Sequence, residues 1–110
     1  MLVYLAAPYS RTSCKNSLMA AVMKFSGEYM LKNKGQFIVS PLFNHFSLEH
    51  VPGLGSDWEF WKEYSEKLMS KCDKLIVLDM PETAESTGVQ AEIQLASAAG
   101  IPIVHLPLGC

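Results

Sequence analysis

Glu92 is the residue of this sequence that is best placed for chemistry, because it lies near the start of a helix-like segment that follows a strand-like one. The apolar run at 75–78 predicts a buried parallel strand, and the Ala-rich run at 91–99, closed by Gly100, predicts a helix packed on that strand. The loop between them then lies at the carboxyl end of a strand, where open α/β sheets bind ligands. Free N–H groups at the start of the helix favour anions there. The segment at 86–92 therefore predicts a ligand site that carries one carboxylate.

The start of this helix sets the chemistry expected of Glu92. Thr87 and Gln90 have the spacing of a capping box, which predicts a helix that begins at Thr87 or Ser86. Glu92 then falls in about the second turn, where the helix dipole stabilises a carboxylate by ~0.3–1 kcal/mol and keeps it ionised. An ionised carboxylate suits a nucleophile better than a general acid. The alternative is that Glu92 only favours the helix and complements its dipole.

Length and composition predict one folded domain over residues 1–110. The apolar fraction is 49% and the mean hydropathy is +0.14, as in globular proteins. No stretch reaches the ~18 uninterrupted apolar residues that a membrane span requires, so no membrane partner is expected. The start at 1–4 lacks the basic region of a signal peptide, and we expect a cytoplasmic protein.

Charge and cysteine usage argue against several kinds of site. Nine basic and eleven acidic residues give a net charge of −2, with no basic stripe of the kind that follows a nucleic-acid backbone. A nucleic-acid polymer is therefore not an expected partner, whereas a single nucleotide is compatible with this charge. Cys14, Cys72 and Cys110 lack a C-x-x-C spacing, and the three histidines show no ligand-like pairing. We expect no disulfide framework, no metal and no cofactor.

The order of the apolar segments predicts the fold. The expected elements are strands at 2–7, 36–39, 74–78 and 101–106, and helices at 14–33, 56–72 and 87–99. This order predicts a parallel doubly wound sheet of four or five strands with helices on both faces, an α/β three-layer sandwich of the Rossmann-like or flavodoxin-like kind. Neither G-x-G-x-x-G nor a Walker lysine occurs, so dinucleotide and P-loop sites are not expected.

The residues around Glu92 also carry a family resemblance. The pattern Ser-x-Gly-x-x-x-Glu-x-x-x-Ala follows a buried strand and precedes Gly-x-Pro and a further apolar strand. In this order it resembles the nucleoside 2-deoxyribosyltransferase superfamily, which includes the nucleoside 5′-monophosphate N-glycosidases. The matching residues are Ser86, Gly88, Glu92, Ala96, Gly100 and Pro102. The similarity in pattern covers most of the chain and is strongest at 1–11 and 73–105.

The resemblance implies a reaction at an N-glycosidic bond. Glu92 matches the family's nucleophile, which forms a covalent bond with the sugar that water or a second base then breaks. The enzyme is a hydrolase in the first case and a transferase in the second, and no sequence feature decides between them. Six residues before the glutamate, the family's nucleoside transferases carry an aspartate and its nucleotide hydrolases a serine. Ser86 therefore favours a nucleoside 5′-monophosphate over a nucleoside.

The loop after the first strand offers further candidates for binding this substrate. It contains Arg11, the only arginine, whose guanidinium suits a phosphate better than a lysine does. The alternative is that Arg11 is an ordinary solvated residue. Tyr4, Tyr9 and Ser10 are candidates for contacts with the sugar or the base.

Other candidates lie in and after the irregular stretch at 41–56. Phe43, Phe46 or Trp58 would offer a stacking face for the base, or would only anchor this stretch on the core. The family's sugar-binding aspartate has no clear counterpart: the expected position holds Tyr-Ser-Glu at 64–66, and Asp57 is the substitute.

Two other functions and the assembly state stay open at this point. The same fold would also serve a non-catalytic nucleotide-sensing domain, since fold does not fix function. A third possibility is cleavage of another N-glycosidic bond, such as that of a nicotinamide dinucleotide. Members of the family commonly complete their pocket with a neighbouring subunit, so the resemblance also implies a homodimer or homotetramer.

Overall fold

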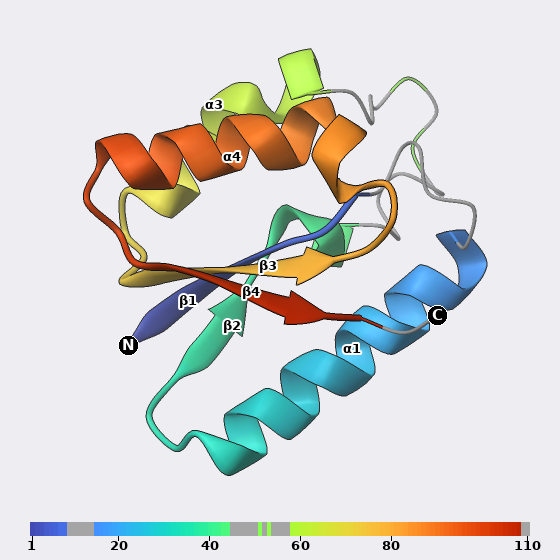
Figure 1. The fold of residues 1–110 in the computed structure, drawn as a ribbon, viewed down its shortest axis with the longest axis vertical. Helices are drawn as coiled ribbons and strands as arrows, with labels where there is room; N and C mark the ends of the chain where they lie inside the picture. Colours follow the sequence, from blue (N-terminus) through green and yellow to red (C-terminus); the bar gives the residue numbers. More distant parts are fainter. Residues whose placement is uncertain (9–14, 45–50, 52, 54–57, 109–110) are drawn as a thin grey trace.

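The computed structural model describes residues 1–8, 15–44, 51, 53 and 58–108, and the side chains of 15–17 and 58 are not part of this description. Figure 1 shows how the elements are arranged. In chain order they are β1 (Leu2–Ala6), α1 (Lys15–Lys32), β2 (Phe37–Val39), the 3-10 turn η1 (Pro41–Asn44), α3 (Trp58–Met69), β3 (Lys74–Asp79), the 3-10 turn η2 (Thr83–Glu85), α4 (Thr87–Ala98) and β4 (Ile103–Pro107).

The described strands form one parallel sheet in the order β2-β1-β3-β4. The chain passes from β1 to β2 on one side and from β3 to β4 on the other, so the winding reverses between β1 and β3. In open α/β sheets, the crevice outside the carboxyl ends of the strands at such a reversal is the usual place for a ligand. The predicted α/β fold, Rossmann-like or flavodoxin-like with four parallel strands, is confirmed.

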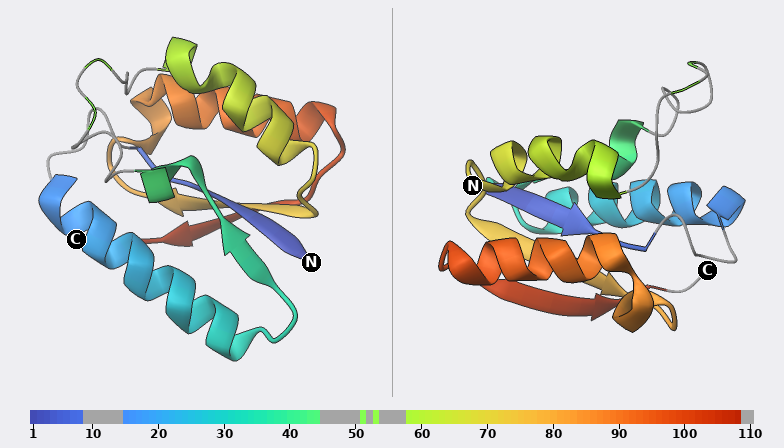
Figure 2. Two further views of the ribbon diagram at one scale, coloured as in Figure 1. Left: turned by 180° about the vertical axis from the view of Figure 1, so that it is seen from behind. Right: turned by 90° about the horizontal axis from the view of Figure 1, so that it is seen from above.

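The helices cover both faces of the sheet, and the alternation of side chains along β1 explains how. α1 lies on one face, and α3 and α4 lie side by side on the other (Figures 1 and 2). Val3 and Leu5 point to the face that packs against α1. Tyr4 and Ala6 point to the face beneath α3 and α4. Successive residues of a strand point to opposite faces, so a single buried strand supplies both halves of the core.

The two ends of α4 show how its sequence fixes the helix. Ser86 is the N-cap, and its side-chain oxygen accepts a hydrogen bond from the Val89 N–H at 3.3 Å. The expected capping box of Thr87 and Gln90 is therefore wrong by one residue, and the Gln90 amide instead donates to the Thr83 carbonyl at 3.0 Å. The helix ends at Gly100, as expected, with φ at +72°.

The hydrogen bonds after this glycine also explain the late start of β4. The Ile101 N–H donates to the Ala96 carbonyl at 2.9 Å, and the Gly100 N–H donates to the Ser97 carbonyl at 3.2 Å. These two bonds are those of a Schellman motif. Because Ile101 completes this motif, the last strand runs over Ile103–Pro107 and not from 101 as expected.

One side chain on α3 differs from expectation. The helical spacing of 56–72 places Tyr64 on the buried face, but it is 43% exposed. The face of α3 that meets the core carries Ser65 and Met69, both buried. Tyr64 lies at the margin of this face, where its hydroxyl accepts a hydrogen bond from the Asn44 side-chain amide at 3.1 Å.

None of the helices in the described part of the chain combines the length and apolar character needed to cross a membrane.

Two glycine-to-alanine changes should have opposite effects on stability. Gly100 has a positive φ, so Gly100→Ala should lower the free energy of unfolding by about 1 kcal/mol. Gly27 lies inside α1 with open space where a Cβ would stand, so Gly27→Ala should raise it by about 0.5–1 kcal/mol. Urea unfolding of both variants measures the difference. Effects of the same sign would contradict the roles given to these two glycines.

Candidate functional site

The structure brings two of the predicted site residues, Glu92 and Tyr4, into direct contact. Tyr4 lies on β1 and is fully buried, and Glu92 lies on α4 and is 8% exposed. The Tyr4 phenol donates a hydrogen bond to Oε2 of Glu92. The pair therefore sits between the sheet and the helical layer of α3 and α4.

The face of α4 that packs on the sheet explains why Glu92 is buried. Val89, Glu92 and Ala96 are the buried residues of this helix, and their spacing places them on one side of it. Glu92 thus occupies a position where an apolar side chain would be usual. A buried carboxylate in such a position is informative, since glutamates are almost never fully buried without a partner.

Burial determines the protonation of Glu92. Loss of solvent raises the pKa of this carboxyl from its ordinary value of 4.5 to about 7, and the hydrogen bond from Tyr4 acts in the opposite direction. The expectation that the helix dipole keeps Glu92 ionised is corrected by this result. Glu92 is the sixth residue of α4, and the dipole effect is confined to about the first turn. Near neutral pH the group is therefore present in both its protonated and its ionised form.

Tyr4 is held in its protonated form by the same surroundings. Burial and the neighbouring Glu92 carboxylate both raise the pKa of the phenol far above its usual value. Tyr4 is thus a hydrogen-bond donor over the whole physiological pH range. It cannot act as a base there.

Ser65 is a member of this site that the sequence did not single out. It lies on α3, is 1% exposed, and its side chain lowers the pKa of the Tyr4 phenol. In the sequence it appeared within Tyr-Ser-Glu at 64–66, where the family's sugar-binding aspartate was expected, and on the buried face of the helical segment at 56–72, but it was given no role of its own. A hydroxyl on such a face is the signal that would have drawn attention to it, because buried polar groups need partners.

The Cys72 thiol is not a nucleophile. Cys72 lies just after α3 and contributes to the electrostatic surroundings of Tyr4. Burial, and then the charge of Asp73, raise the pKa of Cys72 to about 11. Its Sγ is hydrogen-bonded to the Leu68 carbonyl at 3.3 Å. A protonated thiol of this kind is inert at neutral pH.

Ser86 and Gly88 lie at the start of α4. Ser86 is buried, and because its oxygen accepts the bond from Val89, the hydroxyl proton remains available for another acceptor. Gly88 is half-buried in the first turn. Six residues separate Ser86 from Glu92, which corresponds to roughly 9 Å along the helix.

The remaining candidates are apart from this group or outside the described residues. Phe43, in η1, is half-buried and packs against the core on the α1 face, which agrees with an anchoring role and leaves a stacking role untested. Trp58 begins α3, but its side chain is not described. The candidates outside the described residues are Tyr9, Ser10, Arg11, Phe46 and Asp57.

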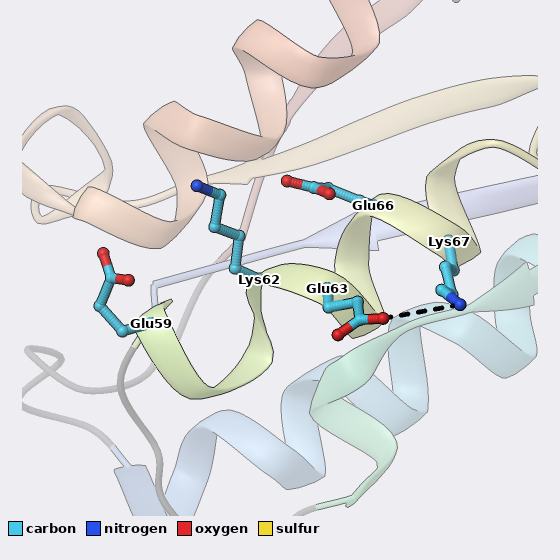
Figure 3. A pocket seen from close by; sticks show the side chains of 5 residues that line it. All are labelled: Glu59, Lys62, Glu63, Glu66 and Lys67. Atoms are coloured by element: carbon cyan, nitrogen blue, oxygen red, sulfur yellow. Dashed lines mark ion pairs between the residues drawn. The ribbon is translucent and has the colours of Figure 1, made fainter.

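A shallow pocket on the outer surface of α3 is distinct from the Tyr4–Glu92 pair. Charged side chains of both signs line it, namely Glu59, Lys62, Glu63, Glu66 and Lys67 (Figure 3). The Glu63 carboxylate and the Lys67 ammonium lie 3.6 Å apart, and both side chains are largely exposed. Exposed pairs of this kind contribute little to stability. We interpret this surface as a solvated helix face.

The comparison with known protein families gives one match. A family model described as "Domain of unknown function (DUF1937)" matches residues 1–107. Since this covers nearly the whole chain, the protein belongs to that family. No curated protein is significantly similar to the chain.

Among the described residues, no group of three histidine, cysteine, aspartate or glutamate side chains is arranged to hold a metal ion.

The raised pKa of Glu92 predicts how stability depends on pH. Between its ordinary pKa of 4.5 and its folded value of about 7, the folded protein retains a proton that the unfolded chain releases. The stability that this proton contributes is complete below about pH 4.5 and is lost as pH rises through about 7, by up to roughly 3 kcal/mol.

Glu92→Gln tests this dependence, because the amide keeps an oxygen for Tyr4 but does not titrate. Urea unfolding from about pH 4 to pH 8 should show the wild type losing stability relative to this variant as pH rises. Glu66→Gln, at an exposed position of α3, should keep the wild-type dependence. A constant difference between the wild type and Glu92→Gln across this range would exclude a raised pKa.

Proposed function

We propose that this protein cleaves or transfers at the N-glycosidic bond of a nucleoside 5′-monophosphate or a nucleoside, through a covalent glycosyl–Glu92 intermediate. The observation that carries the proposal is the buried contact between Glu92 and Tyr4, at the position of the family motif in the sequence. The hydrogen bond supports a carboxylate held in one orientation, and orientation is what a nucleophile needs.

The reaction would proceed in two displacements at C1′ of the sugar. An oxygen of ionised Glu92 attacks C1′ while the C1′–N bond breaks, and the bonding electrons leave with the base, which takes a proton. Water, or the nitrogen of a second base, then attacks C1′, loses a proton and releases the Glu92 carboxylate. Because Tyr4 binds Oε2, we assign the attack to Oε1. This chemistry requires no metal or cofactor.

A 5′-phosphate fits the start of α4. The Ser86 proton is available there, beside helix N–H groups that favour an anion. Arg11 is proposed as a second phosphate ligand because it follows β1, whose carboxyl end lies at the same edge of the sheet as that of β3.

We place the enzyme in the cytoplasm and propose a homodimer or homotetramer in which a neighbouring subunit helps to close the pocket.

One observation favours a second candidate function. Glu92 is almost completely buried, and a glutamate that only stabilises its surroundings would also be buried and hydrogen-bonded. A non-catalytic domain that binds a nucleotide at the start of α4 accounts for this equally well. Nucleotide binding without release of a base would support that function.

Release of free base tests the enzymatic proposal. We expect chromatography to detect base released from one or more members of a panel of ribo- and deoxyribonucleosides and their 5′-monophosphates, offered with and without a second base as acceptor. Glu92→Ala should reduce the rate by about a thousandfold or more. Glu66→Ala, which removes an exposed glutamate, should leave it unchanged. If the wild type releases nothing from any substrate, the glycosidic function is wrong for these compounds.

The charge at position 86 tests the preference for a phosphate. Aspartate and asparagine both cap helices as serine does, so Ser86→Asp and Ser86→Asn should fold and differ mainly in charge. Ser86→Asp should weaken binding of the preferred monophosphate about tenfold relative to Ser86→Asn, because a carboxylate repels the phosphate. Binding of the corresponding nucleoside should differ little between them. Equal losses for both ligands would argue against a phosphate at this position.

A further inference from the structure

β4 forms one edge of the sheet, and its backbone hydrogen bonds show which side of it is paired. It is the last strand in the order β2-β1-β3-β4, and Figure 2 shows it at the margin of the sheet. The Leu75 N–H donates to the Pro102 carbonyl at 2.9 Å, and the Leu108 N–H donates to the Asp79 carbonyl at 3.2 Å. Backbone groups alternate in direction from one residue of a strand to the next. The even-numbered residues from 102 to 108 therefore direct theirs toward β3.

The odd-numbered residues of β4 direct their backbone groups away from β3. Ile103 and His105 each present an N–H and a C=O at this outer edge, whereas Pro107 presents a C=O alone, because proline has no N–H. Among the described residues, no strand pairs with these groups. The other edge of the sheet differs, since β2 has three residues and within it only Ile38 directs its backbone outward.

The side chains of β4 leave this edge open to another strand. Natural edge strands avoid further pairing through charged side chains, prolines, bulges or short length. β4 contains no lysine, arginine, aspartate or glutamate, and the apolar side chains of Ile103, Val104 and Leu106 are only partly buried. The imidazole of His105 is bound to the carboxyl group of Asp79 on β3, with Nδ1 and Oδ1 3.1 Å apart. The ring is thereby held on the side of β3.

We propose that this edge is an interface between two copies of the chain, in which β4 pairs antiparallel with β4 of a second copy about a two-fold axis at Val104. In this register Ile103 of each copy pairs with His105 of the other. Each outward N–H of these two residues then meets an outward C=O, as in the hydrogen-bonded pairs of an antiparallel ladder. Pro107, which has no N–H to offer, lies just beyond the paired residues.

The side chains of β4 fit a second copy in this register. The two Val104 side chains oppose each other across the axis in a non-hydrogen-bonded pair, with ~4.5 Å between their Cα atoms, and contacts between β-branched side chains stabilise such pairs. No acidic or basic chain of β4 other than His105 is present to oppose its own copy. A symmetric contact of this kind closes at two subunits. The interface is argued from the sheet alone and does not depend on the proposed function.

His105→Pro and His105→Ala are a matched pair that tests the interface. Proline removes the outward N–H of residue 105 and is tolerated in an edge strand, whereas alanine keeps this N–H. Two short paired strands make a small interface, so we expect a dissociation constant of roughly 1–100 µM. Sedimentation velocity from about 5 to 500 µM should show dimers of the wild type and of His105→Ala, and only monomers of His105→Pro. A wild type that stays monomeric, or a dimer that proline does not weaken, would overturn the proposal.

Disulfide formation tests the register and needs no proline variant. In a background with Cys14→Ser and Cys110→Ser, Val104→Cys should link two copies under mild oxidation, because residues opposed on the axis have Cβ atoms near disulfide distance. Cys72 remains because it is buried. Leu106→Cys is the control: it lies on the same face of the strand but opposes residue 102 of the other copy. A non-reducing gel should show a covalent dimer for position 104 alone. No link at 104, or an equal link at 106, would contradict the pairing.

Discussion

The hydrogen bond between Tyr4 and Glu92 is the constraint on which the rest of this structure depends. It joins the first strand to the last helix across the apolar interior between them. A carboxylate in such surroundings is costly without a partner, so the position of α4 on the sheet and the orientation of Tyr4 are linked. Any packing of α3 and α4 that separated this pair would leave a polar group buried and unsatisfied.

The same contact places stability and chemistry in opposition. Burial shifts Glu92 toward its protonated form, which is the more stable form in the fold but not the form that attacks an electrophile. Perturbed titrations of this kind are frequent at functional sites, although structural networks also produce them. The Tyr4 hydroxyl limits the shift by donating a hydrogen bond that the ionised carboxylate accepts.

The sequence was sufficient to predict the order of the elements and the position of Glu92 on a helix. Both depend on patterns within short segments of the chain. The buried run at 75–78, Gly100 and the helical spacing over 14–33 act within short distances along the chain, and the structure confirms the elements they predict. The predicted start of α4 at Thr87 or Ser86 is confirmed, since the helix begins at Thr87 with Ser86 as its N-cap. The capping box of Thr87 and Gln90 was placed one residue late, because Ser86 and Thr87 are both residue types that cap helices well.

What the sequence did not predict arises from contacts between distant segments. Ser65 and Tyr4 lie on different elements, and no spacing along the chain shows that they meet. The raised pKa of Glu92 likewise depends on how completely the packing of α4 on the sheet buries this side chain. Rules for local helix formation do not predict that burial. The exposure of Tyr64 follows from how far α3 is rotated against α4 and η1, so helical periodicity alone gave the wrong face for that side chain.

The separation of 88 residues between Tyr4 and Glu92 also has a consequence for synthesis of the chain. Tyr4 leaves the ribosome 88 residues before Glu92 does. The loop closed by this contact contains most of the domain, so the contact forms only after the intervening segments have ordered. The site is therefore assembled only after α4 has been synthesised. A fragment that stops before α4 leaves the Tyr4 phenol without its carboxylate.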